Sequence, residues 1–256
     1  MDEILRVEGL TKTFKLSRKQ QRIEGTRSAT KVAVDGLSFS AYRGEIFGLL
    51  GPNGAGKTTT LRMLATLIRP DSGDALVDGA SIVGDAEAVR AKIGFLTSEL
   101  KREEFFTPAY LFNFFARLHG VDGATADARR EVLFQRFGID RFAEVKVANL
   151  STGMKQKTSL AVSLVHDPDI IIFDEPTNGL DVLTARVVTD FLAELRGQDK
   201  TIILSTHIFS LVERLCDRVG IIVDGRLTHC DTLAALCGDL SLEDRFFEIY
   251  KALKDQ

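Results

Sequence analysis

Short apolar runs alternate along the chain with longer segments in which apolar residues recur every three or four positions. The first pattern is typical of buried β-strands and the second of amphipathic helices, so their alternation predicts an α/β fold. Runs such as residues 170–173 are apolar throughout, as in strands covered on both faces. We expect strands at residues 5–10, 32–39, 45–50, 75–77, 93–96, 170–173, 201–205 and 219–223, and helices at 57–68, 107–119, 126–137, 152–166, 183–196 and 208–215.

Two parts of the chain depart from this alternation. Residues 108–149 show no strand pattern and are predicted to form an all-helical insertion. Near the C-terminus, Ser241 is a candidate N-cap for a helix whose apolar face repeats at helical spacing. We therefore expect the chain to end in an amphipathic helix.

Composition narrows the class of protein. The 256 residues are 45% apolar, with 33 basic and 36 acidic side chains, so the core is sizeable and the net charge of −3 gives no general attraction to nucleic acid. No apolar run approaches the roughly 18 residues of a membrane-spanning helix, and the N-terminus lacks a signal-peptide pattern. Three cysteines without C-x-x-C spacing indicate reduced thiols. We expect a cytoplasmic protein without a transmembrane segment of its own.

One segment, residues 15–31, is strongly basic. It contains six lysines and arginines against the single acid Glu24, with few apolar residues. We interpret it as an exposed loop between two strands, because charge runs usually indicate a solvated surface. A surface that contacts lipid headgroups or a partner protein is the alternative.

A glycine-rich loop follows the predicted strand 45–50 and precedes a helix. It reads Gly51, Pro52, Asn53, Gly54, Ala55, Gly56, Lys57, Thr58 and Thr59, which matches G-x-x-x-x-G-K-[ST] in its required context. Glycines let backbone N–H groups turn toward phosphate oxygens, and the helix N-terminus adds partial positive charge. Lys57 is expected to reach the outer phosphates and Thr58 to bind Mg²⁺, while Thr59 assists.

Two adjacent acids, Asp174 and Glu175, end the apolar strand 170–173. Ligands of α/β sheets bind at this edge, and carboxylates beside a dry core need a compensating cation. We expect Asp174 to help hold Mg²⁺ and Glu175 to orient or deprotonate the attacking water. The alternative is that both acids cap the turn that follows.

Three further segments carry candidate residues. Ser151 is a predicted N-cap, and Gly153 in the first helical turn suggests that something approaches the backbone closely. A second anion-binding helix end is the functional interpretation, and a simple helix start is the alternative. His207 follows strand 201–205 and can hydrogen-bond a γ-phosphate, or it is structural. Asp181 begins a helix, where capping is the simpler role.

Taken together, these segments resemble the ATP-binding subunit of an ABC transporter over nearly the whole chain. Residues 51–59 are similar to its Walker A loop, 150–156 to its signature motif, 170–175 to Walker B with the catalytic glutamate, 179–181 to its D-loop, and His207 to its switch histidine. The resemblance implies a P-loop NTPase core with a mixed, mainly parallel sheet, an antiparallel β subdomain and an all-helical signature subdomain. The expected divisions are residues 1–98 and 167–240 for the core, 99–166 for the helical subdomain, and 241–256 for the C-terminal helix.

The resemblance also implies partners. Two copies would dimerise head to tail, so that each Mg-ATP lies between one Walker A loop and the signature helix of the other copy. Phe14 would stack on adenine, or else it is a core residue. The helical subdomain, with aromatics such as Phe106 and Tyr110, would contact a membrane permease or pack on its own core. The protein would thus be peripheral on the inner face of the cell membrane.

Some residues depart from the family pattern. Where a glutamine is usual after strand 93–96, the chain has Thr97, Ser98 and Glu99, of which Ser98 or Glu99 is a candidate for contacting Mg²⁺ through water. The signature carries Thr152 and Met154 in place of glycine and glutamine. The basic segment and the triplet at residues 97–99 resemble those of sodium-extrusion subunits of the exporter class.

The predicted function is therefore an ATPase that powers export through a separate permease. An ABC-type ATPase in cytosolic assembly without a permease is the alternative. A nucleotide-binding regulator that hydrolyses little is a third reading, against which Glu175 argues.

Overall fold

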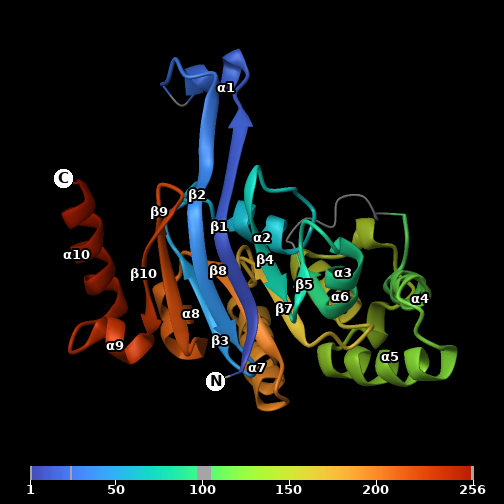
Figure 1. Cartoon of the computed structure of the whole chain (residues 1–256). Helices are drawn as coiled ribbons and strands as arrows, with labels where there is room; N and C mark the ends of the chain where they lie inside the picture. Colours follow the sequence, from blue (N-terminus) through green and yellow to red (C-terminus); the bar gives the residue numbers. More distant parts are fainter. Residues whose placement is uncertain (1, 24, 97–104, 255–256) are drawn as a thin grey trace.

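The computed structural model describes residues 2–23, 25–96 and 105–254, which contain two β-sheets (Figure 1). The larger sheet has the strand order β10-β9-β3-β8-β7-β6, and all of its neighbours are parallel except β10 and β9. The smaller, antiparallel sheet has the order β2-β1-β4-β5. The strands are β1 (Glu3–Lys15), β2 (Thr30–Tyr42), β3 (Ile46–Leu50), β4 (Ser72–Val77), β5 (Ala80–Ser81), β6 (Ile93–Leu96), β7 (Ile170–Asp174), β8 (Thr201–Thr206), β9 (Arg218–Val223) and β10 (Arg226–Thr232).

The helices lie on both faces of the larger sheet and at its sides (Figure 1). Those beside the smaller sheet are α2 (Lys57–Leu64) and α3 (Ala86–Lys92). The helical insertion contains α4 (Pro108–Leu118), α5 (Gly123–Phe137), two 3-10 turns and α6 (Thr152–Ser163). The remaining helices are α1 (Arg18–Ile23), α7 (Val182–Gly197), α8 (Phe209–Leu215), α9 (Leu233–Cys237) and α10 (Leu242–Lys254).

The central strand β7 shows why the sheet is covered twice. Its side chains alternate between faces, as the pleat requires. Ile170 and Ile172 belong to the core shared with the smaller sheet and α2, whereas Ile171 and Phe173 belong to the core shared with the helical insertion and α7. All five residues of β7 are buried. The continuous apolar run is therefore the signature of a two-sided strand, and the predicted α/β fold class is confirmed.

Several element boundaries differ from the predictions. Helix α2 ends at Leu64 rather than residue 68, because Thr66 adopts a left-handed conformation with φ 58°. Helix α6 ends at Ser163 rather than 166. The elements β5, α1, α3, α9 and β10 were not predicted; they are short, or, like β10, polar and largely exposed.

The interpretation of residues 15–31 as a loop is wrong in part. Strands β1 and β2 pair as far as Lys15 and Thr30, and Leu16 N donates to Ala29 O at 2.8 Å. The two strands rise clear of both sheets as a ribbon with α1 at its far end (Figure 1). None of the residues of α1 is buried, so the expected exposure is confirmed.

Among the described residues, no helix combines the length and the apolar character needed to cross a bilayer.

Candidate functional site

The glycine-rich loop joins the end of β3 to the start of α2. Gly54 and Gly56 have φ values of 81° and 103°, which residues other than glycine rarely adopt. A Cβ on Gly56 would lie 2.3 Å from Ala33 O, and one on Gly51 would lie 2.2 Å from Ile222 O. Because no side chain caps α2, the amides of its first turn remain available to an anion.

Lys57 is the first residue of α2 and is only 5% exposed. Its Nζ donates to Gly51 O at 2.7 Å and Pro52 O at 3.1 Å, and lies 3.8 Å from Glu175 Oε1. Burial lowers the pKa of Lys57, against the opposing effect of the two nearby carboxylates. The ammonium group is thus held inside the loop, within reach of the oxygens of a phosphate that the loop encloses.

Asp174 ends β7 beneath the loop. Its Oδ1 accepts from Thr58 Oγ1 at 2.9 Å and from Ser205 Oγ at 2.6 Å. Ser205 lies opposite Asp174 in the parallel pairing of β7 and β8. The hydroxyl and the carboxylate predicted to bind Mg²⁺ are therefore adjacent, although residues 58 and 174 are far apart in sequence.

Glu175 follows in a left-handed conformation with φ 53°. Its N–H donates to Ser205 O at 3.1 Å, which fixes the turn. His207 Nδ1 lies 3.0 Å and 3.1 Å from the two carboxylate oxygens of Glu175. A non-glycine residue in this conformation is strained, and strain of this kind is common where side chains are aimed for function.

These groups, apart from Asp174 and Ser205, line one cavity of about 500 Å³. The loop from Asn53 to Thr59 lines it together with Glu175 and His207. Phe14, at the end of β1, lines it together with Lys31 and Ala33 of β2. Phe14 is 38% exposed, so it is not a core residue, and stacking on adenine stays a prediction.

Sequence reasoning missed four contributors to this site: Lys31, Ala33, Asn178 and Ser205. Ala33 O is the atom that excludes a side chain at position 56, and Asn178 lines the cavity. Of these residues, only Ser205 could have been identified from the sequence, because it ends predicted strand 201–205 at the edge of the sheet where residue 174 is expected.

The predicted signature residues do not line this cavity within the described part of the chain. Ser151 caps α6 by accepting from Met154 N at 3.3 Å. A Cβ on Gly153 would lie 3.1 Å from Thr184 Oγ1, so the close approach comes from α7 of the same chain. Asp181 caps α7 through Leu183 N and Thr184 N, both at 3.0 Å, and these bonds lower its pKa. Roles for these residues toward nucleotide stay predictions, and Ser98 lies outside the described residues.

The oxygens present fit a magnesium ion bound with a nucleotide. Thr58 and Asp174 offer one hydroxyl and one carboxylate, and Mg²⁺ binds through such oxygens while keeping waters and substrate phosphates. In the described ranges no group of three or more histidines, cysteines and acids converges as a metal site.

Comparison with known proteins supports the resemblance. Residues 34–178 match the model of a family described as "ABC transporter". The chain is 38% identical to the ABC transporter ATP-binding protein NatA of Bacillus subtilis (strain 168), over 88% of this chain and 91% of the relative. It is 40% identical to the Nod factor export ATP-binding protein I of Ralstonia nicotianae, over 93% of this chain and 74% of the relative.

A solved structure gives the same answer for the fold. The dimeric structure of MJ0796, a bacterial ABC transporter cassette, superposes with a TM-score of 0.76 at 25% identity, covering 90% of this chain and 98% of that one. The family match spans the loop, Asp174 and Glu175. The chain belongs to the ABC transporter family as one of its ATP-binding subunits, and it is an ATPase.

Proposed function

We propose that this ATPase powers export through a separate membrane permease, with two copies closing head to tail around two Mg-ATP. Glu175 carries the proposal: its carboxylate is in contact with His207 at 3.0 Å and lies 3.8 Å from the ammonium of Lys57. A regulator that binds nucleotide without hydrolysing it needs only the phosphate-binding loop and not this carboxylate. A carboxylate held between a phosphate-binding lysine and a histidine is the arrangement that hydrolysis requires.

The chemistry follows from the positions of these groups. Lys57 and the loop amides hold the phosphate oxygens, and Thr58 and Asp174 would hold the magnesium ion. Magnesium bound there would supply positive charge that offsets the negative charge developing on the phosphate oxygens. Glu175 orients the attacking water and accepts its proton at a carboxylate oxygen. His207 fixes that carboxylate and donates to the γ-phosphate, and Phe14 supports the adenine.

Closure into a dimer is supported by the open cavity and by the relative that forms one. The phosphate cavity lacks signature residues of its own chain, so a second copy is the natural source of Ser151 and Gly153. MJ0796 is dimeric. ATP drives closure only as far as it binds the closed dimer more tightly than the open chains.

The permease partnership is supported by exposed aromatic side chains at α4. Phe106, Tyr110 and Phe114 lie one helical turn apart, with ring centroids 4.5 Å and 6.3 Å from one another in succession. All three are exposed, and Phe105 beside them is 83% exposed. An apolar surface of this kind indicates a partner. Export as the direction follows the relative whose name is Nod factor export ATP-binding protein I.

Dimerisation is tested with Glu175→Gln, which removes the base and keeps the shape. Light scattering with Mg-ATP should show a stable dimer that hydrolyses little, and adding Lys57→Met should abolish it. A Glu175→Gln chain that hydrolyses ATP like the wild type would remove this residue from its role.

Permease binding is tested by co-purification with the membrane protein encoded next to this chain. Replacing Phe106, Tyr110 and Phe114 by serine should abolish co-purification and preserve ATP binding. Val132→Ser, at an exposed apolar position on α5, is the matched control. Failure of the wild-type chain to retain any membrane protein would favour the alternative, an ATPase in cytosolic assembly.

A further inference from the structure

The charge of this chain is divided unevenly. Of its 33 basic and 36 acidic residues, six and one lie in residues 15–31, which leaves 27 basic and 35 acidic residues elsewhere. The body of the protein is therefore acidic, while one short segment carries a net charge of +5. Such asymmetry indicates a local anionic partner rather than a general electrostatic effect.

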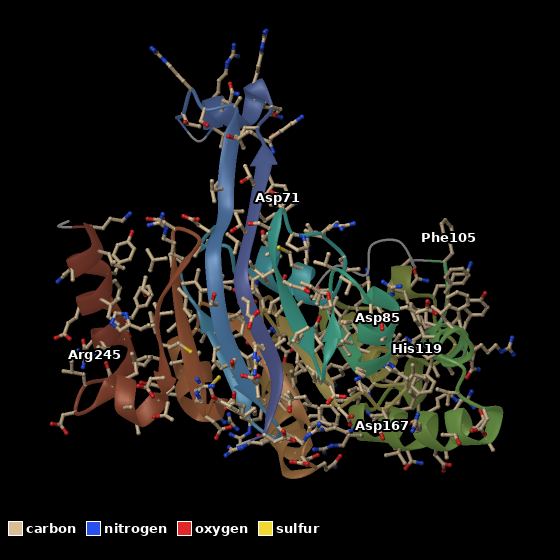
Figure 2. The ribbon with its side chains drawn as sticks, viewed as in Figure 1. Asp71, Asp85, Phe105, His119, Asp167 and Arg245 are labelled. Atoms are coloured by element: carbon tan, nitrogen blue, oxygen red, sulfur yellow. The ribbon has the colours of Figure 1, made fainter. Side chains whose placement is uncertain are left out.

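The fold separates this charge from the body. We define the ribbon tip as residues 16–23 and 25–29, at the far end of the ribbon formed by β1 and β2. Figure 2 shows its side chains spreading outward, away from the two sheets. Among the described residues, Arg18, Lys19, Arg22 and Arg27 have no acidic partner, whereas Lys12, at the base of the ribbon, pairs with Asp71 at 2.8 Å.

The shape of the tip suits a phosphate-bearing surface. Arg18, Arg22 and Arg27 all line one shallow hollow, so three arginines lie close together at the tip. Guanidinium groups bind phosphate oxygens in pairs of hydrogen bonds. Ile23 is 75% exposed beside these cations. An exposed apolar side chain among cations is the pattern of segments that rest on a membrane interface.

We propose that the ribbon tip binds the headgroups of anionic phospholipids on the membrane surface beside the permease. The proposal rests on the permease partnership above, which holds the subunit next to a bilayer. In Figure 2 the ribbon tip and Phe105, beside α4, both lie toward the upper side of the molecule. A permease seated on the α4 aromatics therefore leaves the tip on the side from which the membrane approaches.

The size of the effect follows from the number of cations. Each lysine or arginine near an anionic leaflet raises partitioning by roughly fivefold, and the attraction fades within a Debye length. Replacing the four unpaired cations should lower binding by about 600-fold. The acidic body is repelled by the same leaflet, so the tip alone accounts for the binding.

The test uses the purified chain without a permease. Co-sedimentation with vesicles of phosphatidylglycerol and phosphatidylcholine should show binding at low salt that is lost at 1 M salt and is absent with phosphatidylcholine alone. The variant Arg18→Gln/Lys19→Gln/Arg22→Gln/Arg27→Gln should not bind. A control that removes four other exposed, unpaired cations, Arg117→Gln/Arg141→Gln/Lys146→Gln/Lys251→Gln, should bind like the wild type.

A local readout places the contact. The chain contains no tryptophan, so Ile23→Trp provides a unique fluorescent reporter at the tip. Its emission should shift to shorter wavelength with anionic vesicles and be quenched by brominated lipid. Equal binding of the tip variant and the wild type, or an unquenched tryptophan, overturns the proposal. If the wild type does not bind anionic vesicles, the proposal is also overturned, and an acidic protein surface becomes the expected partner of the tip.

These results are separable from those on the proposed function, because vesicle binding needs neither ATP nor a permease. A chain that binds vesicles and retains no permease would contradict the partnership and keep the lipid contact. A chain that retains a permease and does not bind vesicles would support the partnership and contradict the lipid contact.

Discussion

The charge of the buried Lys57 has opposite effects on stability without and with bound nucleotide. Without nucleotide, Lys57 donates to two loop carbonyls and lies near Glu175, yet burial lowers its pKa, so the charge is costly to hold there. Lys57→Met keeps an unbranched stem of similar length and removes the charge. We expect the variant to be nearly as stable as the wild type when empty and to gain nothing from ATP.

The magnitudes follow from two opposing effects. Two hydrogen bonds from a charged donor are lost, each a net contribution of about 1.5–3 kcal/mol, but the desolvation of a buried ammonium is relieved at the same time. The free energy of unfolding of the empty chain should therefore change by only about 1 kcal/mol. ATP at 100 times its dissociation constant stabilises the wild type by about 2.7 kcal/mol. For a chain of this length that raises the melting temperature by about 5–11 °C.

Thermal unfolding with and without Mg-ATP measures both quantities. The wild type should show the full shift and Lys57→Met almost none, while Lys251→Met, at an exposed position of α10, should behave like the wild type. A variant that keeps most of the ATP shift would show that Lys57 does not bind phosphate. A fall in the melting temperature of the empty variant by more than about 8 °C would show that the lysine holds the loop together.

Three further predictions concern His207, Ser205 and His166. His207→Ala should lower kcat by roughly a hundredfold, because the carboxylate of Glu175 loses its partner and the phosphate a donor; unchanged turnover in a steady-state assay would leave the histidine a structural role. Ser205→Ala should raise the Mg²⁺ concentration needed for half-maximal ATPase by about tenfold or more, because Asp174 loses a 2.6 Å hydrogen bond, and an unshifted Mg²⁺ titration would count against it. Burial and a stacked imidazole lower the pKa of His166 to about 4, so the unfolded chain binds a proton first and the free energy of unfolding should fall by about 2 kcal/mol as pH drops from 6.5 to 4. Denaturant unfolding should show a flatter pH dependence for His166→Phe, and a parallel curve would contradict the assignment.

The sequence predicted those features that local chemistry determines. A run of apolar residues ending in Asp174 and Glu175 requires a two-sided strand, and the glycines of the loop allow a backbone that other residues resist. Both features depend on neighbours within a few residues. The order of the motifs was therefore sufficient to place the phosphate loop and the acids at one edge of the sheet.

The ribbon shows where local reasoning fails. Residues 15–31 contain few apolar residues, whose alternation is the usual signal of a strand, and their pairing is sustained by backbone hydrogen bonds such as Leu16 N to Ala29 O. A ribbon whose described residues at the far end are exposed or only partly buried needs no apolar face. Its composition is therefore the same as that of a loop, and only the partner strand, about fifteen residues away, distinguishes the two.

Gly153 shows that a correct observation can have more than one cause. A glycine in the first turn of α6 predicts that another group approaches the backbone closely. That group is Thr184, whose Oγ1 lies 3.1 Å from the position of a Cβ on Gly153. The same hydroxyl donates to Asp181 at 2.7 Å. The residue that caps α7 therefore holds in place the side chain that excludes a Cβ from α6. Two motifs assigned separately from the sequence are thus parts of one packed junction. A nucleotide bound by a second copy at Gly153 would contact a surface whose shape Asp181 determines. A change at Gly153 or at Asp181 should therefore alter both the α6–α7 junction and the binding of that nucleotide.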